Sequence, residues 1–211
     1  MGETIDIGRR IELVPMDSHF QDITIGLYSQ EQDEGPAFLV HTYSRLDGTE
    51  QRIAFVRSAM KILGGMEFTP DGLLRFPCKT KHELACKRIF LEACKLDPAK
   101  QIEPRPLNTF DKKSGFTVTV LSIGNGVYQI TADGEGRHRE KRISAIGGGL
   151  IKLGQMDETG EDADRVAFSC GHVHDAMVGL LLVRAPNVRA VMREQQAVAS
   201  RGTLSAPSQQ E

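Results

Sequence analysis

Two stretches of the chain decide the fold: RIAFVRSAMKILGGM at residues 52–66 and RISAIGGGLIKLGQM at residues 142–156. Set over each other at an offset of 90 residues, they share Arg, Ile, Leu, Gly and Met. Apolar residues also coincide where the residue types differ, as at Val56 and Ile146. Similarity of a chain to itself at a fixed spacing is the signature of an internal repeat. The sequence therefore predicts a tandem duplication.

A second pair of stretches supports the repeat further along the chain. FPCKTKHELACKRIFLEA at residues 76–93 matches FSCGHVHDAMVGLLLVRA at residues 168–185 in Phe, Cys, His and Ala, now at an offset of 92. The two additional residues fall where EFTPDG in the first half corresponds to the longer DETGEDAD in the second. Both segments read as loops, where changes of length are tolerated.

The hydrophobic pattern gives each repeat the same elements. FQDITIGLYS and AFLVHTYS predict two strands, and GFTVTVLSIGNGVYQITA predicts a second pair around a Gly-Asn-Gly turn. Ile53, Val56, Met60 and Leu63 form the stripe of an amphipathic helix that closes at Gly64. A short strand and a second helix follow, so the unit is β-β-α-β-α, with room for an extra strand near Met66. The predicted class is α+β, a two-layer fold in which the duplicated units form an intramolecular pseudo-dimer.

Domain boundaries follow from the same patterns. We expect the first repeat at residues 11–96 and the second at residues 115–187. Residues 97–114 contain three prolines and few apolar residues, which indicates a surface linker. Residues 195–211 lack periodicity and are expected to be disordered.

Composition narrows the class of protein. The formal charge of −2, three tyrosines and no tryptophan give no reason to expect nucleic acid binding. No run is apolar enough for a membrane span, and the charged start of the chain does not resemble a secretory signal. Four cysteines without a C-x-x-C pair predict reduced thiols in the cytoplasm.

The stretch FSCGHVHD, residues 168–175, is the first candidate site. Cysteine and histidine are ordinary zinc ligands, and side chains at a strand-to-helix junction converge on one rim. The first repeat has a related junction with its own histidine and acid. A divalent metal such as Zn²⁺ would then be held by residues from both repeats, and the candidates are Cys170, His172, His174, Asp175, His82 and Glu83.

A structural interpretation competes with this site, and from the sequence alone we favour it. TKHE reads as a capping box in which Thr80 caps the second helix and Glu83 reaches back, and Asp175 takes the matching place in the other repeat. The histidines at the edge of the apolar face then pack in the core. The cysteine and histidine spacings match no zinc-finger pattern. If any histidine is functional, His172 is expected to be, because the first repeat has Thr80 in its place.

The second candidate site is a basic cluster at the start of the helix in the second repeat. Arg137, Arg139 and Arg142 near a helix N-terminus suit an anion such as phosphate. Three glycines follow at residues 147–149, and two of them align with the small residues Ser58 and Ala59. Those glycines favour close contact with another helix over a nucleotide-binding loop.

Two hypotheses of function remain. The first is a binding or accessory protein that holds a small anionic ligand or a protein partner between its halves. The alternative is a metal-dependent enzyme whose Cys/His/Asp site lies at the strand-helix junction of the second repeat. No nucleophile with an adjacent base is visible in the sequence, so no catalytic residue is assigned and we favour the first hypothesis.

Overall fold

The computed structural model describes residues 7–15, 23–43, 47–111, 116–133, 137–159 and 164–187. Over these ranges the protein is a mixed α+β structure with two antiparallel sheets and four α-helices. The tail at residues 195–211, for which disorder is predicted, lies outside the described residues. None of the described helices is both long enough and apolar enough to cross a bilayer.

The first half contains one sheet and two helices. Its sheet has the strand order β1-β2-β3-β5-β4, and every neighbouring pair is antiparallel. Helix α1 connects β3 to β4, and α2 follows β5. The elements are β1 (Arg9–Pro15), β2 (Thr24–Gln30), β3 (Ala37–Thr42), α1 (Thr49–Gly64), β4 (Glu67–Phe68), β5 (Leu74–Arg75) and α2 (Glu83–Lys95).

The second half has the same order of elements. Its strands are ordered β6-β7-β8-β10-β9 in an antiparallel sheet, with α3 after β8 and α4 after β10. The elements are β6 (Asn108–Asp111), β7 (Phe116–Gly124), β8 (Val127–Ala132), α3 (Arg137–Gly154), β9 (Asp157–Glu158), β10 (Arg165–Ala167), α4 (Asp175–Arg184) and the 3₁₀ turn η1 (Ala185–Asn187).

Each half has one more strand at its start than the sequence pattern predicts. In the first half this strand is β1, which pairs with β2, the first strand of the predicted hairpin. In the second half it is β6, which pairs with β7 in the same way. Strand β6 falls within residues 97–114, the segment expected to be a linker. Its four residues follow a proline-rich stretch and are too few for a clear period, so only pairing with β7 reveals them. The extra strand expected near Met66 is present as β4.

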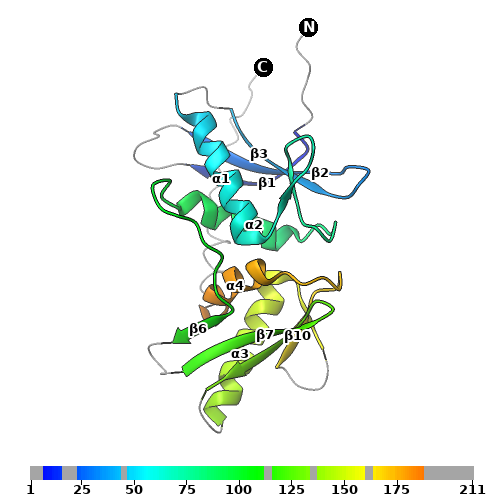
Figure 1. Cartoon of the computed structure of the whole chain (residues 1–211), viewed down its shortest axis with the longest axis vertical. Helices are drawn as coiled ribbons and strands as arrows, with labels where there is room; N and C mark the ends of the chain where they lie inside the picture. The colour runs from blue at the N-terminus through cyan, green and yellow to red at the C-terminus, as the bar shows by residue number, and fades with distance from the viewer. Residues whose placement is uncertain are drawn as a thin grey trace, which may run out of the picture.

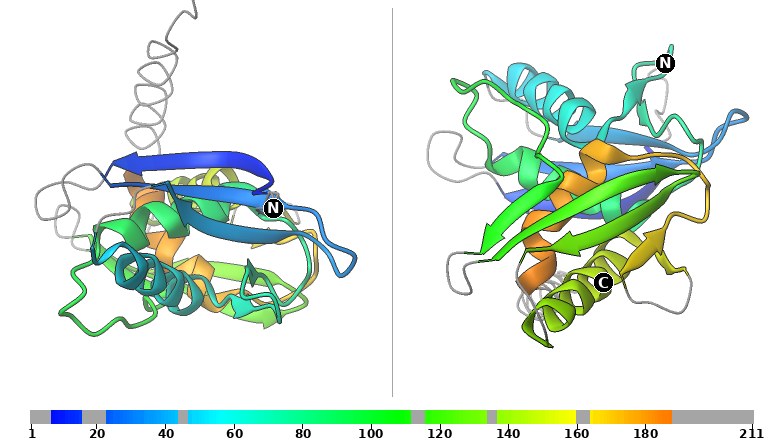
Figure 2. Two further views of the ribbon diagram at one scale, coloured as in Figure 1. Left: turned by 90° about the horizontal axis from the view of Figure 1, so that it is seen from above. Right: turned by 60° about the horizontal axis from the view of Figure 1, so that its bottom comes forward.

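The two halves meet through their helices. Figure 1 shows one half above the other, with α2 and α4 adjacent where the halves meet. The first sheet lies behind α1 and α2 in that view, whereas the second lies in front of α3 and α4. Figure 2, seen from above, shows the helices in the space between the two sheets. Helices α2 and α4 therefore lie at the centre of the molecule.

The predicted helical stripes are buried. Ile53, Val56, Met60 and Leu63 of α1 pack in the core, and so do Ile143, Ile146, Leu150 and Leu153 of α3. Helix α1 ends at Gly64, as predicted, and the next residue, Gly65, caps it in the left-handed conformation with its N–H donating to Lys61 O. The apolar core is continuous through both halves.

Glycine in α3 permits close packing, as expected from the sequence. A Cβ atom on Gly149 would lie 2.5 Å from the backbone oxygen of Ala185, whereas one on Gly148 would meet nothing within 4 Å. The close contact between α3 and the end of α4 therefore requires glycine at position 149 but not at position 148.

A buried arginine joins the two helices of the first half. Arg52 of α1 is 6% exposed, and it donates to Leu96 O at 3.1 Å and to Cys94 O at 2.6 Å. These carbonyls belong to the end of α2, where the helix dipole favours a cation. Burial lowers the pKa of Arg52. Arg52 therefore serves as a C-terminal cap supplied by a neighbouring helix.

Candidate metal centre

Four side chains from the two halves meet where α2 and α4 begin. Cys78 and His82 lie between β5 and α2, and Cys170 and His174 lie between β10 and α4. One thiol or imidazole ligand atom from each residue lies within 4.8 Å of every other. Each half thus contributes one C-x-x-x-H motif to a single cluster.

Matching turns place the two cysteines. Lys79 N–H donates to Phe76 O, and Gly171 N–H donates to Phe168 O. The residue after each cysteine has a positive φ, 58° at Lys79 and 69° at Gly171. Such a turn reverses the chain after the short strand and directs both sulfur atoms toward the junction between the halves.

Within each motif the thiol is already close to the imidazole. Cys78 Sγ lies 3.2 Å from His82 Nε2, and Cys170 Sγ lies 3.3 Å from His174 Nε2. The two imidazole rings are 4.8 Å apart between centroids, at an interplanar angle of 74°. In a tetrahedral zinc site with Zn–S of about 2.3 Å and Zn–N of about 2.0 Å, neighbouring sulfur and nitrogen atoms lie about 3.6 Å apart. The two Sγ–Nε2 distances lie close to that value.

Aromatic side chains enclose the histidines. Phe76 packs edge-on against His82 at 5.2 Å, and Phe168 does the same against His174 at 5.0 Å. Each phenylalanine also contacts the histidine of the other half. His82 and His174 are 7% and 6% exposed, whereas Cys78 and Cys170 are half-buried. The imidazoles are therefore enclosed by aromatic rings, and the two thiols are more accessible to solvent.

Burial sets the protonation of the cluster. Desolvation lowers the pKa of His82 to about 4, with a smaller effect of His172, and lowers the pKa of His174 to about 4, with smaller effects of His82 and His172. Burial also raises the pKa of the Cys170 thiol. At neutral pH both imidazoles are uncharged, which is the form that binds a metal.

The two halves differ in what supports each histidine. The backbone N–H of His174 donates to the hydroxyl oxygen of Tyr128 at 2.5 Å. The repeat alignment places Phe38, which has no hydroxyl group, at the position of Tyr128. The ring of Phe38 packs edge-on against Phe76 at 6.0 Å between centroids, and the ring of Tyr128 packs in the same way against Phe168 at 6.1 Å. His82 has a left-handed backbone with φ of 37°, whereas His174 has φ of −133°.

Three of the six predicted metal ligands belong to the cluster: His82, Cys170 and His174. The fourth member, Cys78, is absent from the predicted set, although the repeat alignment places it directly over Cys170. The spacing becomes recognisable only when one C-x-x-x-H motif is taken from each half.

The other three predicted ligands lie outside this group. His172 is exposed, and its ring Nδ1 lies 2.8 Å from Cys170 O. Glu83 forms an ion pair with Arg9. Asp175 begins α4, where its carboxylate is one cause of the raised pKa of Tyr128, after burial.

The predicted capping box is wrong. Helix α2 begins at Glu83 and its N-cap residue is His82, which makes no side-chain cap hydrogen bond; the same holds for His174 before α4. Thr80 therefore lies too far before α2 to cap it. Both N-cap side chains face the thiols instead of the helix amides, so capping does not account for these histidines.

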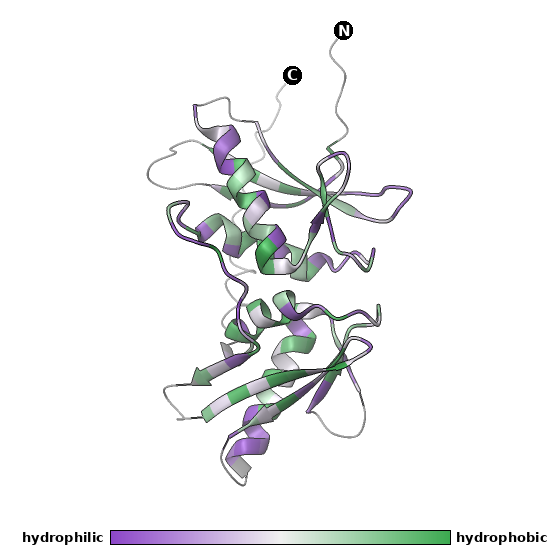
Figure 3. Cartoon of the chain, in the orientation of Figure 1, coloured by the Kyte–Doolittle hydropathy of each residue, from purple (hydrophilic) through white to green (hydrophobic). Residues whose placement is uncertain are grey.

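The basic cluster begins α3, at the hydrophilic end of that helix in Figure 3. Arg139 Nε donates to Ala132 O at 3.0 Å, so part of its guanidinium supports the end of β8. Arg142 is half-buried one turn further along. The backbone of Arg137 is described at the start of α3, but its side chain lies outside the described residues.

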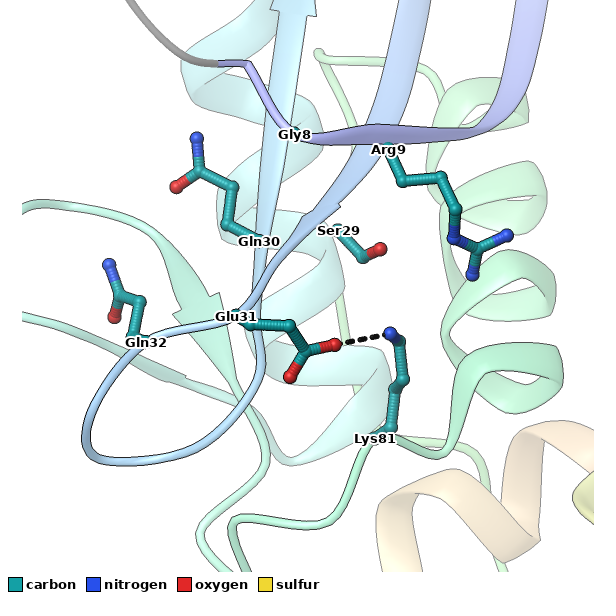
Figure 4. Close-up of a pocket in the computed structure, with 7 residues that line it drawn as sticks. All are labelled: Gly8, Arg9, Ser29, Gln30, Glu31, Gln32 and Lys81. Atoms are coloured by element: carbon teal, nitrogen blue, oxygen red, sulfur yellow. Dashed lines mark hydrogen bonds and ion pairs between the residues drawn. The ribbon is translucent and has the colours of Figure 1, made fainter.

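A separate polar hollow lies beside β1 and the β2–β3 loop (Figure 4). It is lined by Gly8, Arg9, Ser29, Gln30, Glu31, Gln32 and Lys81. Its charged groups are already used within the protein, because Lys81 pairs with Glu31 at 2.5 Å and Arg9 pairs with Glu83.

Comparison with known proteins does not assign the chain to a class. Searches against family models, curated proteins and solved structures found no match. The cluster of two thiols and two imidazoles is the feature from which function must be argued.

Proposed function

We propose that this is a metal-binding protein in which one Zn²⁺ is held between the two halves by Cys78, His82, Cys170 and His174. The observation that carries the proposal is the mutual approach of the four ligand atoms within 4.8 Å. Residues 92 positions apart in the sequence supply matching donors at one point. Simple core packing does not require two thiols to face two imidazoles.

The donor set favours zinc. Two sulfur and two nitrogen donors in a tetrahedral arrangement are the usual environment of structural Zn²⁺. Hard ions such as Mg²⁺ and Ca²⁺ require oxygen ligands, and no carboxylate belongs to the group found among the described residues. Bound zinc would supply the positive charge that stabilises both thiolates in this partly buried place.

The role we propose for the metal is structural. Four protein donors complete a tetrahedral shell and leave no position for a substrate or an activated water, as a catalytic zinc site would require. The ligands come equally from the two halves, so binding would couple the docking of α2 against α4 to the metal. The complete shell and the equal sharing of ligands favour a zinc-clamped protein over the metal-dependent enzyme.

The arrangement also supports a tandem duplication whose units pack as a pseudo-dimer. The two halves have the same element order and corresponding strand orders. Equivalent turns precede equivalent helices, and the cysteines and histidines occur at the same places. A shared metal at the junction is what a symmetric pair of units would hold.

A small anionic ligand at the start of α3 is a separate proposal. Arg137, Arg139 and Arg142 begin a long helix, whose N-terminus attracts negative charge. Millimolar phosphate should then raise the melting temperature, and replacing Arg137 and Arg142 together should remove that rise. An equal melting temperature with and without phosphate would contradict this site.

Metal analysis of the purified chain tests the zinc proposal. After dialysis against metal-free buffer, the protein should retain one zinc per chain, and the double variant Cys78→Ser/Cys170→Ser should retain none. Cys86→Ala is the matched control, because Cys86 lies fully buried on α2 outside the cluster. Absence of zinc from protein reconstituted with it, or equal retention by the double variant, would contradict the proposal.

A further inference from the structure

The two cysteines of the metal cluster form a pair as well as a set of ligands. Cys78 and Cys170 come from different halves, and their sulfur atoms lie no more than 4.8 Å apart. Both are half-buried, and neither is in a disulfide. Each lies in a turn just before a helix, where the backbone adjusts more easily than inside an element.

The remaining two cysteines are in a different environment. Cys86 is fully buried and Cys94 is 5% exposed, both on the core side of α2. Burial raises the pKa of Cys94 to about 12 and raises that of Cys86 as well. Fully buried thiols of this kind are inert toward oxidants. Cys86 and Cys94 therefore serve as unreactive controls for Cys78 and Cys170 within the same chain.

We propose that Cys78 and Cys170 are a redox modification site: a peroxide joins them in a disulfide that replaces the metal as the link between the halves. This inference rests on the same cluster as the proposed function, but the reaction itself needs no metal. Reduced thiols and bound Zn²⁺ would be one state of the junction, and the disulfide would be the other.

The reaction balances with hydrogen peroxide as the oxidant. One sulfur attacks a peroxide oxygen, the O–O bond breaks, and a sulfenic acid and one water form. The second sulfur then attacks the sulfenic sulfur, the S–O bond breaks, and a second water leaves. Two thiols are oxidised to one disulfide while one peroxide is reduced to two waters. Zn²⁺ keeps its charge and is released, because neither disulfide sulfur remains an anionic ligand.

The geometry of the two thiols favours this chemistry at the cluster. Both sulfur atoms face the same group of side chains, with Cys78 Sγ 3.2 Å from His82 Nε2 and Cys170 Sγ 3.3 Å from His174 Nε2. The N–H of Thr80 also points to Cys78 Sγ, at 3.4 Å. A disulfide needs its sulfur atoms to approach to about 2.05 Å, so the final step closes the gap between two side chains that already face the same point.

Peptide mapping tests the inference directly, because trypsin places every cysteine on its own fragment. Cys78 falls in residues 76–79, Cys170 in 166–184, Cys86 in 82–87 and Cys94 in 89–95. Full-length protein, with its metal removed by a chelator, is treated with hydrogen peroxide, and its remaining thiols are alkylated before digestion. Mass spectrometry should find fragment 76–79 linked to 166–184, with loss of two hydrogen atoms, while the other two cysteines are alkylated.

Variants and the zinc-loaded protein complete the test. Cys170→Ser should abolish the linked fragment, and Cys86→Ala should leave it unchanged. In zinc-loaded protein, one zinc should be released to a colorimetric indicator for each link formed. Formation of separate sulfinic acids at Cys78 and Cys170, or persistence of both reduced thiols under excess peroxide, would overturn the inference. If the link forms in a chain that binds no zinc, the redox site stands and the proposed metal centre fails; if zinc binds but no link forms, the metal centre stands and the redox site fails.

Discussion

The hydroxyl oxygen of Tyr128 accepts a hydrogen bond from the backbone N–H of His174, at 2.5 Å. This bond fixes the start of α4 just where the His174 imidazole turns toward the thiols. Tyr128 is fully buried, and the position corresponding to it in the first half is Phe38. The hydrogen bond to Tyr128 therefore supports His174, whereas Phe38 has no hydroxyl group with which to support His82 in the same way.

We predict that Tyr128→Phe weakens zinc binding about 10-fold, since outer groups that orient metal ligands typically contribute 10- to 100-fold. The phenyl ring retains the packing, so the effect belongs to the lost hydrogen bond. Competition with a chromophoric chelator measures the affinity, and the absorption of the Co²⁺-substituted protein reports ligand geometry. Tyr28→Phe, at another buried tyrosine, is the control. Equal affinity and an unchanged Co²⁺ spectrum would show that the hydroxyl does not position His174.

Two adjacent glycines of α3 should respond in opposite directions to alanine. Gly149→Ala places a methyl group 2.5 Å from Ala185 O and should lower the free energy of unfolding by roughly 1 to 3 kcal/mol. Gly148→Ala meets nothing within 4 Å and should raise it by up to about 1 kcal/mol through helix propensity. Urea unfolding of both variants measures the difference. Equal effects would contradict the described contact between α3 and the end of α4.

Arg52→Met should destabilise the first half by roughly 1 to 3 kcal/mol, because the carbonyls of Cys94 and Leu96 lose buried donors. Arg52→Lys keeps the charge but cannot reproduce both hydrogen bonds, so an intermediate loss is expected. Chemical denaturation provides the measurement. Wild-type stability in Arg52→Met would remove the assignment of this side chain as a cap for α2.

Acid should destabilise the metal-free protein in a defined range of pH. The folded pKa values of His82 and His174 are about 4, below the ordinary value of 6.5, because both rings are buried. The unfolded chain therefore binds more protons between these values, and stability falls as the pH drops from about 6.5 to about 4. At pH 5 the loss should be roughly 1 to 2 kcal/mol for each histidine.

Thermal unfolding of chelator-treated protein across that range measures the acid effect. The double variant His82→Gln/His174→Gln should have a flatter profile between pH 7 and 5, even if its overall stability is lower. An identical slope in the variant would show that other groups cause the acid sensitivity.

Much of this architecture could be predicted from the sequence, because the apolar stripes of α1 and α3 recur at a constant offset and are buried as expected. Strands β1 and β6 could not be delimited, since their pairing partners, and not their own short patterns, define them. The TKHE pattern also predicted too early a start for α2. In the structure these residues lie in a turn, and α2 begins only after His82, which has a positive φ.

The candidate site was predicted only in part for a related reason. The local pattern of FSCGHVHD favours neighbours such as His172 and Asp175, which lie close together in the chain. The fold selects residues four apart, because the turn and the start of the helix direct Cys170 and His174 to the same side. The other two ligands come from a motif 92 residues away, so their meeting depends on how α2 packs against α4.

X-ray absorption at the zinc edge of the purified, zinc-loaded chain determines whether the four side chains hold the metal. We predict one zinc per chain with two sulfur neighbours at about 2.3 Å and two imidazole nitrogens at about 2.0 Å. The double variant Cys78→Ser/Cys170→Ser should lose the sulfur shell. A shell made only of oxygen and nitrogen in the wild-type protein, or a sulfur shell that survives in the double variant, would contradict the proposed metal centre.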